Sequence, residues 1–474
     1  RKKMPVNLEE LMSVEGIGPK TVRDLYKHLR IKNLKDLERA AKVHKIQKLP
    51  SFGEKTEQNI IESIAFVKRS HDRWLLGDIY PHVEDLILLL RTSGLVKEAV
   101  AAGSIRRMKE TIGDVDLLVT TKKPKEVIEY FLSKIPFEKR INIDVRVLEE
   151  DVFGAGLQYF TGSKEHNVKL RTYAASLGFK VSEYGVFKGK KKIACRTEED
   201  VYKALGMPYI EPELREDHGE IEAALGHRLP HLIPYGSLKG DLQIQTDWTD
   251  GEGTTLEMAK GAKKQGLEYI AITDHTKDLA MVGGSDERKL LRQMKEIDRA
   301  QKKISGIKIL KGAEVNIRKD GTLDIADEML AKLDVVGAAV HSSFKMARKD
   351  MTERVVRAMR NPHVDILFHP TARSMPKRGE CDLDMDVIIE EAKQMGTVLE
   401  INAQPRRLDL KDIYIRKAKE AGVKMIIDSD AHSVEHLKFL RYGIAQARRG
   451  WAETEDVINT FSLSKFLAFL KDKR

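Results

Sequence analysis

The sequence predicts a chain of several domains, in which a helical N-terminal region precedes a mixed α+β region and an α/β domain with parallel strands. Its 474 residues exceed what one compact core usually holds. Near the N-terminus, apolar residues recur three or four apart in TVRDLYKHLR and TEQNIIESIAFVKR, which indicates amphipathic helices. From residue 241 onwards, short apolar strands alternate with helical segments, a pattern typical of parallel sheets and barrels.

The predicted domain boundaries follow changes in these patterns. Short amphipathic helices occupy residues 1–72, and a longer helical stretch with the strand-like segments EAVAAGS, GDVDLLVT and INIDVRVLEE occupies 73–150. A mixed polar region fills 151–228. LPHLIPYGSLKG, at 229–240, has the Pro and Gly spacing of a linker. The α/β domain, 241–474, is expected to take its strands from six segments: YIAITDH, GIKILKGAEV, DVVGAAVHSS, VDILFHP, GTVLEIN and KMIIDSDAHS.

Composition excludes a membrane protein and a disulfide-stabilised one. No stretch approaches the roughly 20 apolar residues of a membrane span, and no signal peptide is visible. Two cysteines, Cys195 and Cys381, suit a reducing cytoplasm. The net charge is +10, of which +7 lies in residues 1–240 and +3 in 241–474. An anionic partner is therefore expected first in the N-terminal half, although basic charge alone also fits simple solubility.

Three aspartates in the middle region suggest a site for divalent cations. Asp114 and Asp116 lie two apart in a predicted strand, so both side chains leave the same face. Asp144 occupies a second strand-like segment, INIDVRV. Carboxylates converging from two strands suit two cations about 4 Å apart, and Mg²⁺ prefers such oxygen ligands. A D-x-D pair alone is usually only a solvated face, so this pattern needs support from its surroundings.

That support comes from a loop just upstream of the aspartates. GSIRR, residues 103–107, ends a predicted strand with a small residue, a hydroxyl and two guanidiniums. Backbone N–H groups, a hydroxyl and arginines are the groups that bind a triphosphate. GSIRR followed by GDVD, with a third aspartate on a later strand, is much more specific than any one of these parts.

Residues 1–228 resemble the family-X DNA polymerases, the group that contains DNA polymerase beta. The resemblance rests on GSIRRMKETIGDVDLLV (103–119), IDVR (143–146) and YFTGSKEHNVKLR (159–171). It implies helical fingers with helix-hairpin-helix motifs, then a nucleotidyltransferase palm at 73–150 and a thumb at 151–228. It also implies that Asp114, Asp116 and Asp144 are catalytic and bind Mg²⁺ or Mn²⁺, with Asp144 nearest the primer 3′-hydroxyl.

The same resemblance implies nucleotide contacts in the phosphate loop and the YFTGS segment, from Gly103, Ser104, Arg107, Gly113, Tyr159, Phe160, Gly162 and Asn167. Arg171 is expected near the template. Two residues depart from the family pattern: Met108 stands where the family usually has glycine, and Asn142 replaces an arginine beside the third aspartate.

Two glycine-containing loops near the N-terminus are candidate helix-hairpin-helix motifs. VEGIGPKT (14–21) offers Gly16 and Gly18 for close approach of the backbone to a phosphate, with Lys20 beside them. LPSFGEKT (49–56) offers Gly53 and Lys55. Both motifs are expected to hold DNA backbones without reading sequence, although a Gly-stopped turn in any helical bundle looks similar. Family members commonly begin with a small lyase domain, which is expected to be missing here.

Four histidines of the C-terminal domain end predicted strands. His275 follows AITD, His341 follows GAAV, His369 follows ILF and His432 ends DSDAH. With Asp250, Glu314 and Asp430 they form a set suited to zinc, manganese or iron. One such histidine is more often structural, but four in one register predict a metal centre.

This half of the chain resembles the PHP domain, the polymerase and histidinol phosphatase family, in DLQIQTDWTDG, AITDH, GAEV, VHSSF, FHP and SDAH. The resemblance implies a distorted β/α barrel with three Zn²⁺ or Mn²⁺ ions at the strand ends. The first ion would use Gln243, Gln245, Glu314 and Asp430. The second would use Asp250, His275 and His432. The third would use His341, His369 and a bridging Glu314.

The first of these metal positions departs from the family. Its usual H-x-H is Gln243-Ile244-Gln245 here, and a neutral glutamine oxygen binds zinc much less strongly than imidazole. The PHP activity is therefore expected to be weakened or dependent on high manganese. On this account, changing both glutamines to histidine raises the metal content or the nuclease rate.

The function predicted from these motifs is template-dependent gap filling in DNA repair, including base excision repair, with 3′-end processing by the PHP domain as a 3′–5′ exonuclease or phosphoesterase. The expected partners are gapped or primed duplex DNA and deoxynucleoside triphosphates, bound by a monomer without a membrane. The fused PHP domain implies a bacterial or archaeal source and a cytoplasmic, nucleoid-associated enzyme.

Two alternatives belong to other classes of protein. The chain could be mainly a 3′-end phosphoesterase whose front half presents DNA, but the complete aspartate triad and the altered H-x-H argue against this. It could also be a non-catalytic scaffold for DNA ends. A scaffold has no need of the triphosphate groups Ser104 and Arg107 beside three aspartates.

Overall fold

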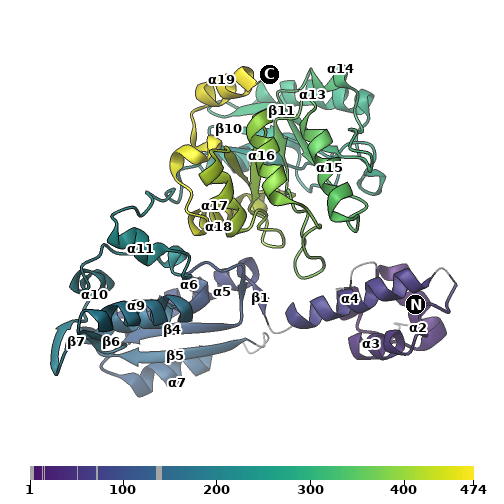
Figure 1. The fold of residues 1–474 in the computed structure, drawn as a ribbon. Helices are drawn as coiled ribbons and strands as arrows, with labels where there is room; N and C mark the ends of the chain where they lie inside the picture. Colours follow the sequence, from purple (N-terminus) through teal and green to yellow (C-terminus); the bar gives the residue numbers. More distant parts are fainter. Residues whose placement is uncertain are drawn as a thin grey trace. The chain divides into compact units, whose positions relative to one another are not determined.

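The computed structural model describes most of the chain in six stretches: residues 5–12, 14, 17–50, 52–70, 73–134 and 141–473. The chain folds into two compact units. The smaller contains residues 1–74 with 373–380, and the larger contains 75–372 with 381–474 (Figure 1). Among the described residues, no helix is both long enough and apolar enough to cross a membrane.

The smaller unit is helical, as its periodicity predicts. Its helices are α1 (Leu8–Met12), α2 (Pro19–Leu29), α3 (Leu34–Lys42) and α4 (Glu54–Ser70). The apolar faces of these helices meet in one core, in which Leu25 and Leu37 are fully buried. Gly18 precedes α2 in an extended conformation and Pro19 occupies the first helical turn, where its missing N–H costs nothing.

A three-stranded sheet forms the first part of the larger unit. Its order is β2 (Glu98–Ala101), β4 (Asp114–Thr120) and β5 (Asn142–Leu148). Strands β2 and β4 are antiparallel, whereas β4 and β5 are parallel and are joined through α7 (Pro124–Lys134). The helix α5 (Leu76–Thr92) precedes the sheet, and the short strands β1 (Trp74–Leu75) and β3 (Thr111–Ile112) pair with each other. The predicted α+β region is confirmed.

The region after β5 is a helical layer with a small hairpin sheet. Its elements are α8 (Phe153–Thr161), α9 (Lys164–Ser176), β6 (Lys180–Ser182), β7 (Gly185–Lys188), β8 (Lys191–Ala194), α10 (Glu198–Ala204) and α11 (Glu220–Leu225). The three strands are antiparallel. Leu170, Val201 and Tyr202 belong to its buried core.

Seven parallel strands form the C-terminal domain. They are β9 (Gly240–Ile244), β10 (Tyr269–Ile272), β11 (Lys308–Asn316), β12 (Val335–Ala339), β13 (Ile366–Leu367), β14 (Val398–Asn402) and β15 (Met425–Asp428). Their order follows the chain from β9 to β15. A parallel bridge between Ile244 and Ala431 brings the two edges together, so the sheet is a nearly closed barrel.

Helices lie around these strands (Figure 1). They are α12 (Thr255–Lys264), α13 (Glu287–Gln301), α14 (Asp327–Leu330), α15 (Arg348–Met359), α16 (Met385–Met395), α17 (Asp412–Ala421), α18 (Leu440–Arg449) and α19 (Leu463–Lys473). All six expected strands are present, and β9 adds a seventh at DLQI. The carboxyl ends of parallel strands meet at one rim, so the polar residues that end them are brought together there.

Candidate functional site

The three predicted catalytic aspartates lie on neighbouring parallel strands. Asp116 of β4 pairs in register with Asp144 of β5, and Asp114 lies two residues before Asp116 on the same strand. Burial, followed by the charge of Asp114, raises the pKa of the Asp116 carboxyl. Carboxylates held in mutual repulsion suit divalent cations, which supply the missing positive charge. The strand positions expected for the aspartates are confirmed.

An arginine that was not anticipated joins two of these carboxylates. The Nη2 of Arg146 lies 2.9 Å from Oδ2 of Asp144, and its Nε lies 3.5 Å from Oδ1 of Asp116. The guanidinium also lies over the Phe160 ring, 4.6 Å from its centroid. The sequence could have indicated this arginine, because residues 144 and 146 are two apart on β5 and therefore share a strand face.

The predicted phosphate loop lies against one of these aspartates, Asp116. Gly103 and Ser104 open the helical turn α6 (Gly103–Arg106) after β2. Gly103 has a φ of +63°, and a Cβ at this position would lie 2.7 Å from Oδ2 of Asp116. Glycine is thus required here both for the backbone conformation and for the close approach. At the end of the loop, Met108 adopts a φ of +52°, which explains why glycine is usual at that position.

Arg107 already has protein partners in this structure. Its Nε donates to Oε1 of Glu216 at 2.9 Å, and its Nη1 donates to the Thr161 carbonyl. A Cβ on Gly162 would approach Nη1 to 3.1 Å. The predicted phosphate-binding arginine is therefore held against the segment 161–162 and against an acidic group of the following region.

The YFTGS segment supplies an aromatic pair and a fixed amide beside the loop. The rings of Tyr159 and Phe160 on α8 are perpendicular, with centroids 5.2 Å apart. Asn167 donates from Nδ2 to the Tyr159 carbonyl at 2.7 Å and accepts from Gln158 at 2.9 Å. Exposed Arg171 donates to the Asn167 carbonyl at 3.2 Å. Gly113 lies between β3 and β4, directly before the first aspartate.

Both candidate hairpins place a glycine immediately before a helix. Gly18 precedes α2 and Gly53 precedes α4, and no atom lies within 4 Å of a Cβ built on either. Lys20 and Lys55 are exposed. Gly16 lies outside the described residues. The two open helix starts are accessible to a phosphate backbone.

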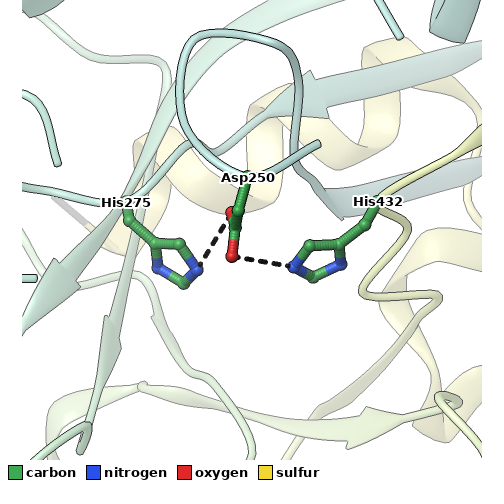
Figure 2. A group of neighbouring side chains, drawn as sticks. All are labelled: Asp250, His275 and His432. Atoms are coloured by element: carbon green, nitrogen blue, oxygen red, sulfur yellow. Dashed lines mark ion pairs between the residues drawn. The ribbon is translucent and has the colours of Figure 1, made fainter. Parts of the chain in front are cut away.

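The rim of the barrel brings together the predicted histidines and carboxylates. Figure 2 shows Asp250 between two imidazoles, with Nε2 of His275 and Nε2 of His432 each 3.6 Å from a carboxylate oxygen. His275, Glu314 and His341 form a second group with the spacing of metal ligands. The Nε2 atoms of His341 and His369 lie 2.9 and 2.8 Å from the same oxygen, Oε1 of Glu314.

The imidazoles are oriented as metal ligands are. His341 donates from Nδ1 to Oδ1 of Asn316 at 2.8 Å, which leaves the lone pair of Nε2 facing Glu314. His432 likewise uses Nδ1 on the Asp430 carbonyl at 2.8 Å. Buried Nδ1 of His275 and Nε2 of His341 have no hydrogen-bond partner among the described residues. A cation between these nitrogens and the carboxylates would satisfy both, so the two groups fit metal ions.

Several side chains in this centre have pKa values far from their usual ones. Burial opposes ionisation of Glu314, but the imidazoles of His275 and His341 hold the pKa of its carboxyl well below the usual value. Burial lowers the pKa of His369, and Arg407 lowers it further, to about 4. His432 is the opposite case, because Asp250 overcomes the effect of burial and raises its pKa to about 9. Perturbation of this size is typical of functional sites.

The first predicted metal position is different from the other two. Gln243 and Gln245 are fully buried, and Gln245 donates from Nε2 to Oε2 of Glu314 at 2.8 Å. Asn402 donates to Oε1 of Gln243 at 2.9 Å and to Oδ2 of Asp430 at 3.2 Å. The Nε of Arg407 also reaches Oδ2 of Asp430, at 3.0 Å.

Three supporting residues of this centre were not anticipated. Asn316 and Asn402 directly end β11 and β14, so the rule that polar residues at strand ends mark the site could have found them. Arg407 lies in the loop after β14, where no spacing rule applies.

Family models match three parts of the chain. The SAM-like helix-hairpin-helix tandem matches residues 8–65, the DNA polymerase beta thumb matches 156–216 and the PHP domain matches 241–404. Among individual proteins, the DNA polymerase/3'-5' exonuclease PolX of Bacillus subtilis is 36% identical over 498 residues, covering 99% of this chain and 86% of that protein.

Two further comparisons cover one half of the chain each. A probable phosphatase of Thermoanaerobacter sp. is 31% identical over 231 residues, covering 47% of this chain and 89% of that protein. A crystal structure of Leishmania infantum polymerase beta, a ternary P/T complex, is 22% identical with a TM-score of 0.27, covering 44% of this chain and 97% of that one.

An aspartate triad under a phosphate loop, followed by a histidine-rich barrel rim, defines a metal-dependent enzyme that acts on phosphate esters. The match to PolX over 99% of this chain identifies the family within that class of enzymes. The chain belongs to the family-X DNA polymerases that carry a PHP domain, and the predicted architecture of fingers, palm, thumb and PHP barrel is confirmed.

Proposed function

We propose that this chain fills short gaps in DNA during repair, adding deoxynucleotides to a primer 3′-hydroxyl, and that its PHP domain processes 3′ ends. One observation carries the polymerase assignment: Asp116 and Asp144 lie in register on parallel strands, with Gly103 of the phosphate loop in contact with Asp116. A site of this form holds a triphosphate against two metal-binding carboxylates.

At the polymerase site, Mg²⁺ or Mn²⁺, when bound, would supply positive charge for phosphoryl transfer. Asp114, Asp116 and Asp144 would hold these ions, with Asp144 on the primer side. Ser104 and Arg107 bind the phosphates, together with backbone groups at Gly103, Gly113 and Gly162. The remaining nucleotide contacts come from Tyr159, Phe160 and Asn167.

The proposed DNA contacts are sequence-independent. A DNA backbone can approach the open helix starts at Gly18 and Gly53, where Lys20 and Lys55 are exposed. From its place in the sequence motif, we expect Gly16 to contribute to the first of these contacts. We expect Arg171 on α9 to lie near the template. We expect a monomer working on gapped or primed duplex DNA in the nucleoid.

At the PHP centre we propose Zn²⁺ or Mn²⁺ held by Asp250, His275 and His432 and by Glu314, His341 and His369. These ions would supply Lewis acidity and a metal-activated water to hydrolyse a phosphodiester or phosphomonoester at a 3′ end. Asn316 fixes the ring of His341, so that Nε2 faces the carboxylate.

Primer extension on a duplex with a one-nucleotide gap tests the assignment. The full chain is expected to extend the primer with Mg²⁺ or Mn²⁺, whereas Asp144→Ala abolishes extension and retains DNA binding. Asp250→Asn is the matched control and should leave extension unchanged. Trimming of 3′ ends without extension by the unaltered chain would instead support a phosphoesterase whose front half presents DNA.

A further inference from the structure

The first metal position of the PHP domain already contains a protein cation. Asp430, the carboxylate expected to bind that metal, is almost fully buried at 4% exposure. Its Oδ2 accepts from Nε of Arg407 at 3.0 Å and from Nδ2 of Asn402 at 3.2 Å. Both donors come from the end of β14 or the loop after it, on the strand that neighbours β15.

The two glutamines at this position are part of the same network. The carbonyl oxygen of Gln243, its only atom able to ligate a metal, accepts from Asn402 at 2.9 Å. Gln245 donates from Nε2 to Oε2 of Glu314 at 2.8 Å, and its neutral Oε1 has no hydrogen-bond partner within the described part of the chain. Of the expected ligands, only that oxygen, the shared carboxylate of Glu314 and the second oxygen of Asp430, Oδ1, remain. These are too few for a metal ion that takes four donors or more.

Electrostatics point to the same conclusion. A buried carboxylate that lost a metal would be left as an uncompensated charge, which is strongly unfavourable. A guanidinium is always charged and donates in fixed directions, so it compensates a carboxylate where a metal ion otherwise would. Arg407 provides this charge here, and Asn402 joins the neighbouring amide and carboxylate to it.

We propose that the PHP centre of this chain binds two metal ions rather than three, and that the guanidinium of Arg407, with the Asn402 amide, permanently takes the place of the first. The inference rests on the metal-binding PHP centre of the proposed function. It changes the account of the altered H-x-H, because restoring two histidines leaves Arg407 on Asp430 and does not by itself create a third site.

The test is the zinc content of the full chain, measured by mass spectrometry after loading and gel filtration. All samples carry Asp144→Ala, so that the polymerase site contributes no tightly bound ion. We expect two zinc ions in this parent and still two in Asp430→Asn, because Asp430 is a partner of Arg407. Asp250→Asn should lose one ion. Three ions in the parent, or a loss of one ion in Asp430→Asn, would overturn the proposal.

A second series separates the roles of the glutamines and the arginine. Gln243→His with Gln245→His should remain at two zinc ions, and adding Arg407→Ala should raise the content to three. Adding Arg406→Ala instead, at the neighbouring exposed arginine, should leave it at two. A third ion in the double variant, or two ions in a folded triple variant, would refute the proposal. Zinc-free parent protein would instead contradict the proposed function itself.

Discussion

At the scale of single residues, the proposed polymerase site depends on one close approach between a backbone and a carboxylate. Gly103 has a left-handed backbone and passes within contact distance of the Asp116 carboxylate. Any side chain at position 103 would contact Oδ2 of Asp116, an oxygen of a proposed metal ligand. Arg146 performs the complementary task, since its guanidinium pairs with both Asp116 and Asp144.

Gly103→Ala is therefore expected to damage catalysis more than folding. The new Cβ would lie 2.7 Å from Oδ2 of Asp116, so we expect kcat/KM for extension to fall by about tenfold or more. The positive φ costs about 1 kcal/mol of unfolding free energy in addition. Gly94→Ala is the matched control, because φ is +70° there and no atom lies within 4 Å. Equal extension rates in the two variants would refute this account.

At the scale of elements, a buried ion pair joins the phosphate loop to the helical region that follows the sheet. Glu198 opens α10 and accepts from Nη1 and Nη2 of Arg106, at 2.9 and 2.5 Å, and from Arg215 at 2.6 Å. Arg215 is fully buried. Burial opposes ionisation of Glu198, but the charges of Arg215 and Arg106 prevail and lower its pKa to about 2.

This pair predicts a loss of stability in acid. Because the folded pKa lies below the unfolded value of 4.5, the carboxylate stabilises the fold fully above pH 4.5, and its contribution disappears as the pH falls to about 2. The contribution is about 3 kcal/mol. Hydrogen exchange of α10 should show Glu198→Gln to be less stable than the parent near pH 6, with the difference shrinking towards pH 2. Glu199→Gln, an exposed neighbour, should match the parent throughout.

At the scale of the whole larger unit, the PHP barrel contacts the phosphate loop of the polymerase. Arg449, at the end of α18 and 1% exposed, donates to Oε1 of Glu216 at 3.0 Å and to the Arg107 carbonyl at 3.1 Å. Glu216 is the carboxylate that also binds Nε of Arg107. One acidic group is therefore shared between a PHP arginine and the proposed triphosphate-binding arginine.

Removing the PHP arginine should weaken nucleotide binding. Without Arg449, Glu216 pairs more strongly with Arg107 and competes with the triphosphate for its guanidinium. We expect Arg449→Ala to raise KM for the nucleotide about three- to tenfold, which corresponds to about 1 kcal/mol, with a smaller change in kcat. Arg441→Ala, which removes another arginine of α18 from Glu84, should leave KM unchanged. A uniform fall in kcat at constant KM would contradict this coupling.

The sequence by itself determined the elements and the candidate site residues, because these depend on local spacing. Alternation placed Asp114 and Asp116 on one strand face, and strand-end positions singled out the four histidines that the barrel brings together. Only the tertiary structure decided what those groups face. Arg107 meets Glu216, 109 residues away, and Asp430 meets Arg407 and Asn402, 23 and 28 residues away. Such pairings arise when the chain closes a barrel or packs two regions together, and no periodicity in the sequence encodes them.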